Sequence, residues 1–194
     1  MKLEELANIR IGLPLARKKG DIHDDSFFRY QAVTLKAFSS TGRLLLDQLD
    51  EFIAKEEISS HFITSQGDIL VRLREPNIAV HIDEKSSGVI VPALMAIIKP
   101  NQNINSIYLT HFINSHEVQK RLRREIKGTT IPMIKAQDLS KLEVTLPTMQ
   151  TQEKIVSILN LANREIELLG QLQNLKTQLK NELLDSLLKK EAKR

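Results

Sequence analysis

The chain has 194 residues, of which 41% are hydrophobic and 27% charged, as expected for a globular domain with an appendage. Cysteine is absent, which excludes a disulfide framework and thiolate catalysis and predicts a cytoplasmic location. No run of about 18 apolar residues is present, and the N-terminal segment lacks the apolar region of a signal peptide, so no contact with a membrane is expected.

The first half of the chain contains several stretches that predict strands, and in the stretch 27–38 apolar and polar residues alternate. The segment at 43–53 fits a helix and a strand equally well. We expect 67–75 and 78–83 to pair, and Pro92 predicts an edge strand or a bulge because proline lacks the amide hydrogen that a ladder needs. A short helix or turn leading into a strand is expected over 3–11, with further strands at 27–38 and 89–100.

Residues 104–128 are predicted to form one helix. Asn105 or Ser106 is placed to cap its first turn, and Gly128 stands where a helix-ending residue belongs. Basic residues fill its last turns, which suits the helix dipole. A loop, a short turn and a final strand follow up to Pro147. Strands and helices are therefore grouped rather than strictly alternating, and the predicted fold class is α+β, with a globular mixed α/β domain over 1–147.

The segment 148–194 is different in kind, because no proline and only one glycine, Gly170, occur between Gln150 and Lys190. A continuous helix of about 40 residues would be roughly 60 Å long. Its apolar residues recur every three or four positions, and a stripe of this length predicts a coiled-coil contact with a second copy or a partner. An intramolecular hairpin broken at Gly170 is the alternative. The stripe consists of Ile155, Leu159, Ala162, Ile166, Leu169, Leu172, Leu175, Leu179, Leu183 and Leu187.

Catalytic and metal-binding patterns are not found in the sequence. His111 and His116 are five residues apart, so they would lie on different faces of a helix and would not form a metal pair. The stretch HIDEK at 81–85 faintly resembles the acid–lysine tail of metal-dependent nucleases but lacks its upstream Pro-Asp partner. Glycine-rich phosphate loops and nucleophile elbows are also missing. The chain is therefore expected to be a non-catalytic binder without a metal or cofactor of its own.

Several short motifs follow one another in a fixed order over nearly the whole chain. They are LEELANIRIGLP at 3–14, SQGDILV at 65–71, YLTHFINS at 108–115, KGTTIPMIKAQDLSKLEVTLP at 127–147 and TQEKIVSIL at 151–159. This order resembles the specificity subunit of type I restriction–modification systems, and the matching positions are Gly67–Leu70, Gly128–Thr130, Leu139–Pro147 and Gln152–Ile155. Thr151 departs from the glutamate that is usual in the family.

The chain differs from the family in its number of domains, since family members usually carry two recognition domains and two long helices in one chain. Here there is one of each, 1–147 and 148–194, which fits either a half-subunit or a fragment of a two-domain subunit. Two copies would pack their helices antiparallel as a homodimer and restore the two-domain arrangement.

The resemblance implies that the domain reads a half-site of double-stranded DNA through the major groove. The long helices would act as a ruler between two half-sites and dock an adenine methyltransferase subunit. That subunit would bring S-adenosylmethionine, and a separate restriction and translocation subunit would bring ATP and Mg²⁺.

Basic clusters indicate where DNA is expected to contact the domain. Such clusters can also be solvated surface, as the basic run at 119–127 would be if Glu117 pairs with Arg121. Two rival classes stay open: a coiled-coil scaffold that does not read DNA, and a standalone nuclease. The residues expected near DNA are Arg17, Lys18, Lys19, Arg72, Arg74, Lys127, Gly128, Thr129 and Thr130.

Overall fold

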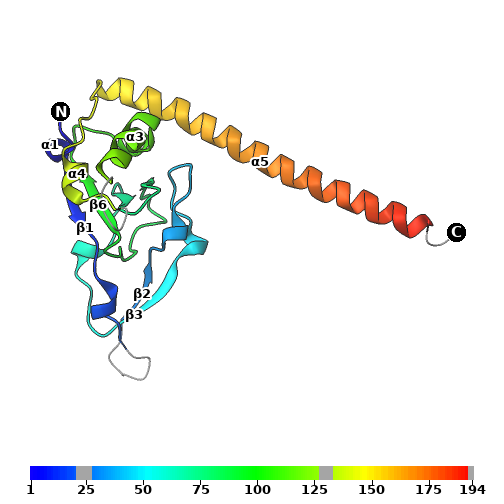
Figure 1. Ribbon diagram of the computed structural model, residues 1–194, viewed down its shortest axis with the longest axis horizontal. Coiled ribbons are helices and arrows are strands. Elements are labelled where there is room, and N and C mark those ends of the chain that lie inside the picture. Colours follow the sequence, from blue (N-terminus) through cyan, green and yellow to red (C-terminus); the bar gives the residue numbers. More distant parts are fainter. Residues whose placement is uncertain (21–27, 127–132, 192–194) are drawn as a thin grey trace. The chain divides into compact units, whose positions relative to one another are not determined.

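The computed structural model describes residues 1–20, 28–126 and 133–191 (Figure 1). The chain divides into two compact units, Met1–Glu153 and Lys154–Arg194. The first unit contains every strand that the structure describes and all the described helices except most of the last one. None of the helices in the described ranges is both long and apolar enough to cross a membrane.

A four-stranded antiparallel sheet forms the centre of the first unit. It consists of β1 (Ala7–Ile11), β6 (Met95–Pro100), β4 (Ile69–Arg72) and β5 (Ala79–His81), in that spatial order. The predicted pairing of 67–75 with 78–83 is confirmed, because Leu70 lies opposite Val80. Successive side chains of β4 and β6 are buried on both sides of the sheet, so the sheet is covered on both faces.

The two faces of the sheet are covered by different kinds of structure. Helices α1 (Leu3–Leu6) and α4 (Ala136–Ser140) contact β1, and α2 (Ser106–Asn114) contacts β5. Figure 1 shows α1, α4 and α3 (His116–Glu125) around β1 and β6. The opposite face packs Leu70, Val80 and Ile97 against Val33, Phe38, Leu44 and their neighbours from the irregular segments.

A two-stranded antiparallel ribbon, β2 (Phe28–Ala32) with β3 (Asp50–Ala54), carries the second apolar cluster. Ala32 bridges to Ile90, which joins the ribbon to the rest of the unit. Short 3-10 helices lie in the segments that connect the strands. They are η1 (Leu15–Arg17), η2 (Leu35–Ala37), η3 (Leu46–Gln48) and η4 (Ser60–Phe62).

Several strands expected from the sequence are shorter in the structure or absent from its described residues. The strand predicted at 27–38 ends at Ala32, because the Thr34 hydroxyl accepts a hydrogen bond from the Lys36 amide and starts η2. The ambiguous segment 43–53 divides into η3 and the beginning of β3. Of 89–100, only Met95–Pro100 is a strand, and Pro92 lies before it. In place of the final strand expected before Pro147, the structure has one isolated bridge, between Lys2 and Glu143.

The single helix predicted at 104–128 is wrong, since α2 and α3 are separate helices. The chain turns at Ser115, whose backbone is extended (φ −62°, ψ 146°) and whose hydroxyl accepts a hydrogen bond from the Val118 amide. Asn105, rather than Ser106, caps α2 by accepting from the amides of Ile107 and Tyr108. The expected helix end at Gly128 lies outside the described residues.

The last helix, α5 (Met149–Glu191), has 43 residues without interruption. The long helix predicted from 148 onwards is therefore confirmed, and the hairpin broken at Gly170 is wrong. Thr148 precedes the helix, and its hydroxyl accepts a hydrogen bond from the Thr151 amide at 3.3 Å, which caps the first turn.

Replacing Gly12 with alanine is expected to destabilise the first unit. The chain leaves β1 close to residues 91–92, with the Leu13 amide donating to the Val91 carbonyl at 2.8 Å. A Cβ atom on Gly12 would lie 2.2 Å from the Pro92 oxygen and 2.3 Å from the Val91 oxygen, and these are backbone atoms that cannot rotate away. We expect the free energy of unfolding, measured by urea denaturation, to fall by about 1–3 kcal/mol. Gly170→Ala, which meets no atom within 4 Å, is the control and should not destabilise the protein.

Candidate nucleic-acid interface

The basic cluster Arg17–Lys19 lies along the end of strand β3. The Gly20 amide donates to the Ile53 carbonyl, and the Lys55 amide donates to the Lys18 carbonyl, so this segment extends the β2–β3 ribbon. The approach is close, because a Cβ atom on Gly20 would lie 2.9 Å from the Lys55 nitrogen. This pairing brings Lys55 into the cluster. Sequence reasoning missed Lys55, since nothing in the local pattern links residues so far apart in the chain.

The charges in this cluster are not equally available to a ligand. Arg17, Lys19 and Lys55 are exposed, and none of them forms an ion pair with another described residue. Lys18 differs, because its ammonium group donates to the carboxylate of Glu56. We therefore define the basic ribbon edge as Arg17, Lys19 and Lys55, with Lys18 already neutralised by Glu56.

The Glu56 carboxyl provides a direct check on this pairing. Hydrogen bonding and the positive charge of Lys18 lower its pKa below the ordinary value, and Lys55 contributes less. Lys18→Gln is expected to raise the pKa of Glu56 towards that of an isolated glutamate, because the carboxylate loses its main stabilising partner. NMR titration of the Glu56 carboxyl carbon would measure the shift. Lys55→Gln is the matched control, and a larger shift in that variant than in Lys18→Gln would contradict the pairing.

The second predicted group, Arg72 and Arg74, does not form one exposed surface. Arg72 is half-buried at the end of β4, where its Nη1 donates to the Leu35 carbonyl at 3.4 Å. Its Nε is buried without a hydrogen-bond partner, and burial lowers the pKa of its guanidinium. Arg74 is exposed beyond the strand and bridges to Met133. Arg72 thus packs between β4 and η2, while only Arg74 is accessible.

The remaining predicted residues of the domain, Lys127, Gly128, Thr129 and Thr130, lie outside the described residues.

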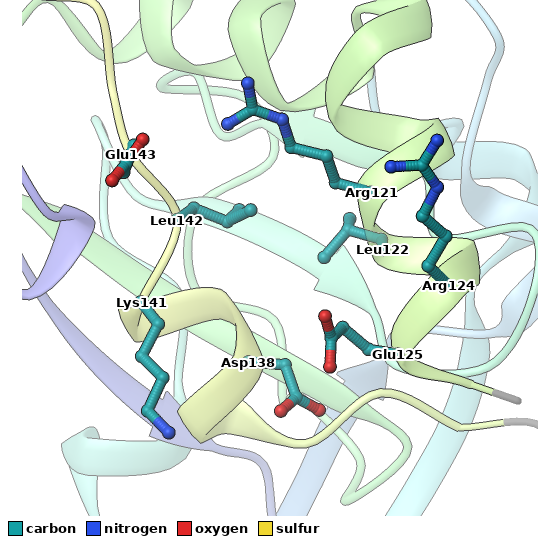
Figure 2. A pocket seen from close by; sticks show the side chains of 8 residues that line it. All are labelled: Arg121, Leu122, Arg124, Glu125, Asp138, Lys141, Leu142 and Glu143. Carbon is teal, nitrogen blue, oxygen red and sulfur yellow. The ribbon is translucent and has the colours of Figure 1, made fainter. Parts of the chain in front are cut away.

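Two arginines of the basic run on α3, Arg121 and Arg124, line a hollow of mixed charge. Figure 2 shows Arg121 and Arg124 with the acidic residues Glu125, Asp138 and Glu143 around this hollow, which has a volume of about 330 Å³. Arg121 also pairs with Glu117 at 2.6 Å, as the solvated-surface interpretation predicts for residues four apart. The acids offset much of the positive charge that would attract phosphate, so the basic ribbon edge is the stronger candidate for a DNA contact.

The second unit presents leucines on its surface. From Ile166 onwards, every residue of the predicted stripe is between 47% and 62% exposed. Leu161 and Leu168 are also exposed, and their spacing to Leu172 and Leu179 places them on the same helical face. The apolar face is therefore wider than predicted. The predicted stripe takes one apolar residue at every third or fourth position, so it leaves out other apolar residues that lie beside it on the helix.

The stretch HIDEK at 81–85, which resembles a nuclease tail, leads into a turn that Asp83 stabilises. The Asp83 carboxylate accepts hydrogen bonds from the Ser86 amide at 2.9 Å and the Ser86 hydroxyl at 2.6 Å, which lowers its pKa and caps a turn. His81 lies half-buried in β5, where burial lowers the pKa of its imidazole. Within the described ranges, His, Asp and Glu side chains form no group of three or more that could hold a metal ion.

Comparison with known proteins gives a family match. Residues 1–178 match the family described as type I restriction modification DNA specificity domain. No curated protein matches the sequence closely enough to be counted as a relative.

Solved structures share the fold at low sequence identity. The HsdS subunit from Thermoanaerobacter tengcongensis has a TM-score of 0.66 and 19% identity, over 95% of this chain and 46% of the other. The type I restriction-modification S subunit from M. genitalium has a TM-score of 0.52 and 12% identity, over 86% and 39%. A chain from a structural study of type I R-M complex assembly has a TM-score of 0.59 and 15% identity, over 87% and 39%. This chain thus spans less than half the length of these proteins.

Proposed function

Because the chain belongs to the family of type I restriction modification DNA specificity domains, we propose that it is a non-catalytic specificity subunit that reads a DNA half-site. The observation that carries this proposal is the extent of the family match, which takes in the whole first unit and most of α5. The recognition domain corresponds to 1–147, and 148–194 supplies the helix for dimerisation, spacing and docking of a methyltransferase.

The basic ribbon edge supports a role in binding phosphates. Its three exposed cations lie on adjoining backbone segments, so they can contact neighbouring phosphates of one duplex. Phosphate contacts fix the position of the protein on DNA, and base contacts then specify the sequence. We expect the base-reading side chains to lie on the same side of the domain as the basic ribbon edge.

The exposed leucine face of α5 supports self-association. An apolar face of this length is unfavourable in water, and a second copy offers the same face. Two copies with antiparallel helices would present two recognition domains related by two-fold symmetry, so the target would be an inverted, bipartite repeat.

Chemistry would come from partner subunits of the complex. An adenine methyltransferase would supply S-adenosylmethionine, and a restriction and translocation subunit would supply ATP and Mg²⁺. This chain would direct their methylation or cleavage to one sequence from the cytoplasm, and it would hold no cofactor itself.

Sequencing of methylated adenines tests the proposal. Cells carrying the chain with its methyltransferase subunit should contain a methylated bipartite inverted repeat, and cells lacking only this chain should lose it. An identical methylation pattern in both, with the methyltransferase expressed, would show that the chain does not direct methylation.

The leucine face also supports a second candidate, a coiled-coil scaffold that does not read DNA. DNA binding by the assembled complex separates the two. A specificity subunit should bind DNA with an affinity that falls steeply as salt rises, whereas a scaffold should add no salt-dependent DNA affinity.

A further inference from the structure

Gln152 is an almost completely buried polar side chain in the first turn of α5, with 1% of its surface exposed. Its Oε1 accepts a hydrogen bond from the Asn105 amide at 2.8 Å, and its Nε2 donates to the Pro147 carbonyl at 2.9 Å. The amide therefore joins the start of α2 to the segment that leads into α5. Loss of either bond would leave a buried polar group unpaired, so this geometry is held firmly.

The α2 side of this connection is itself fixed. The Asn105 side chain caps α2, and the Tyr108 hydroxyl donates to the Thr145 carbonyl at 2.7 Å. The first turns of α2 and α5 and the segment between Thr145 and Pro147 thus form one hydrogen-bonded junction. All of it lies within the first unit.

We propose that Gln152 is a positioning residue that restricts the spacer between the two half-sites to the one length that the long helices define, an inference that rests on the proposed function. Helix α5 continues unbroken from this junction, so the direction of its first turn determines how the recognition domain is presented to DNA. A domain of about 150 residues has a radius of gyration near 15 Å, which puts its surface roughly 20–40 Å from the junction. A rotation of about 5–10° there would move that surface by one base-pair step of about 3.4 Å.

The test compares methylated sites in cells that express the methyltransferase subunit with the wild-type chain or with Gln152→Ala. Without the amide, the junction can rotate, so the variant should also methylate sites whose spacer is one base pair longer or shorter. The wild type must break a hydrogen bond of Gln152 to fit such a spacer, whereas the variant has no such bond to break. We therefore expect methylation of these sites to rise about tenfold over wild type. Lower stability alone would reduce methylation at the original spacer without adding new spacers.

Thr151→Ala is the matched control. Thr151 is the neighbouring residue in the same turn, and its hydroxyl lies 2.9 Å from that of Thr148 and makes no bond to α2. This variant should keep the wild-type spacer. If Gln152→Ala does not accumulate, Gln152→Glu replaces it, because it keeps the acceptor for Asn105 and loses the donor to Pro147.

Each outcome has a distinct meaning. An unchanged spacer in the Gln152 variant, or equal relaxation in Thr151→Ala, would overturn the positioning role and leave the proposed function intact. If the wild-type chain itself directs no bipartite methylation, the proposed function fails first.

Discussion

If the proposed self-association through α5 holds, a chain in which Leu172 and Leu179 are both replaced by glutamate is expected to remain monomeric at concentrations at which the wild type dimerises. The two residues are seven apart and lie on the same exposed face of α5. Burying one leucine side chain contributes about 1.5–3 kcal/mol, and a symmetric dimer would lose four of them. The loss, on the order of 6–12 kcal/mol, corresponds to a dissociation constant weaker by at least about 10⁴-fold. Sedimentation equilibrium would measure it.

The matched control is Asn174→Glu with Asn181→Glu, which adds the same charge at the same spacing. Asn181 is nine residues from Leu172, which places it on the opposite side of the helix. This variant should dimerise like the wild type, since its glutamates stay in water. If the leucine variant dimerises as well as the control, the leucine face does not mediate self-association, and a different partner must cover it.

Features that depend on local pattern could be predicted from the sequence. The pairing of β4 with β5 follows from two short apolar segments that are close in the chain, and α5 follows from an apolar spacing that no proline interrupts. The break between α2 and α3 could not be predicted in this way, because serine is compatible with a helix interior. The Asn114 side chain exchanges two hydrogen bonds with the backbone of Ala79 in β5, and this tertiary contact ends α2 where it does.

The candidate interface shows the same limit. Arg17 and Lys19 could be chosen as contacts because a run of adjacent cations is visible in the sequence. The burial of Arg72 could not be foreseen. The alternation of side chains along β4 predicts which residues share a face of the sheet. It does not predict that the 3-10 helix η2 covers the face that carries Arg72. Lys55 and the neutralisation of Lys18 by Glu56 both depend on the pairing of the chain after Arg17 with β3, which is a long-range contact.

Replacing Arg17 and Lys19 with glutamine should weaken DNA binding by the assembled complex about 30-fold at 0.15 M salt. Each phosphate contact releases about 0.9 counterion, so one contact is worth a factor of about 5 at that salt concentration and two are worth about 30. The slope of log affinity against log salt should become shallower by about 1.8 for the same reason. Because phosphate contacts carry no sequence information, the loss should be equal on cognate and random duplexes. Fluorescence anisotropy over a range of salt concentrations would measure both quantities.

The control variant, Lys18→Gln with Glu56→Gln, changes two neighbouring residues and leaves the net charge of the surface unaltered. These two side chains neutralise each other in the wild type, so their removal should change neither the affinity nor the salt slope. A loss in the control as large as in the test variant would mean that Lys18 leaves Glu56 to contact DNA. An unchanged slope in the Arg17 and Lys19 variant would remove the basic ribbon edge from the interface. A loss confined to the cognate duplex would instead assign these side chains to the reading of bases.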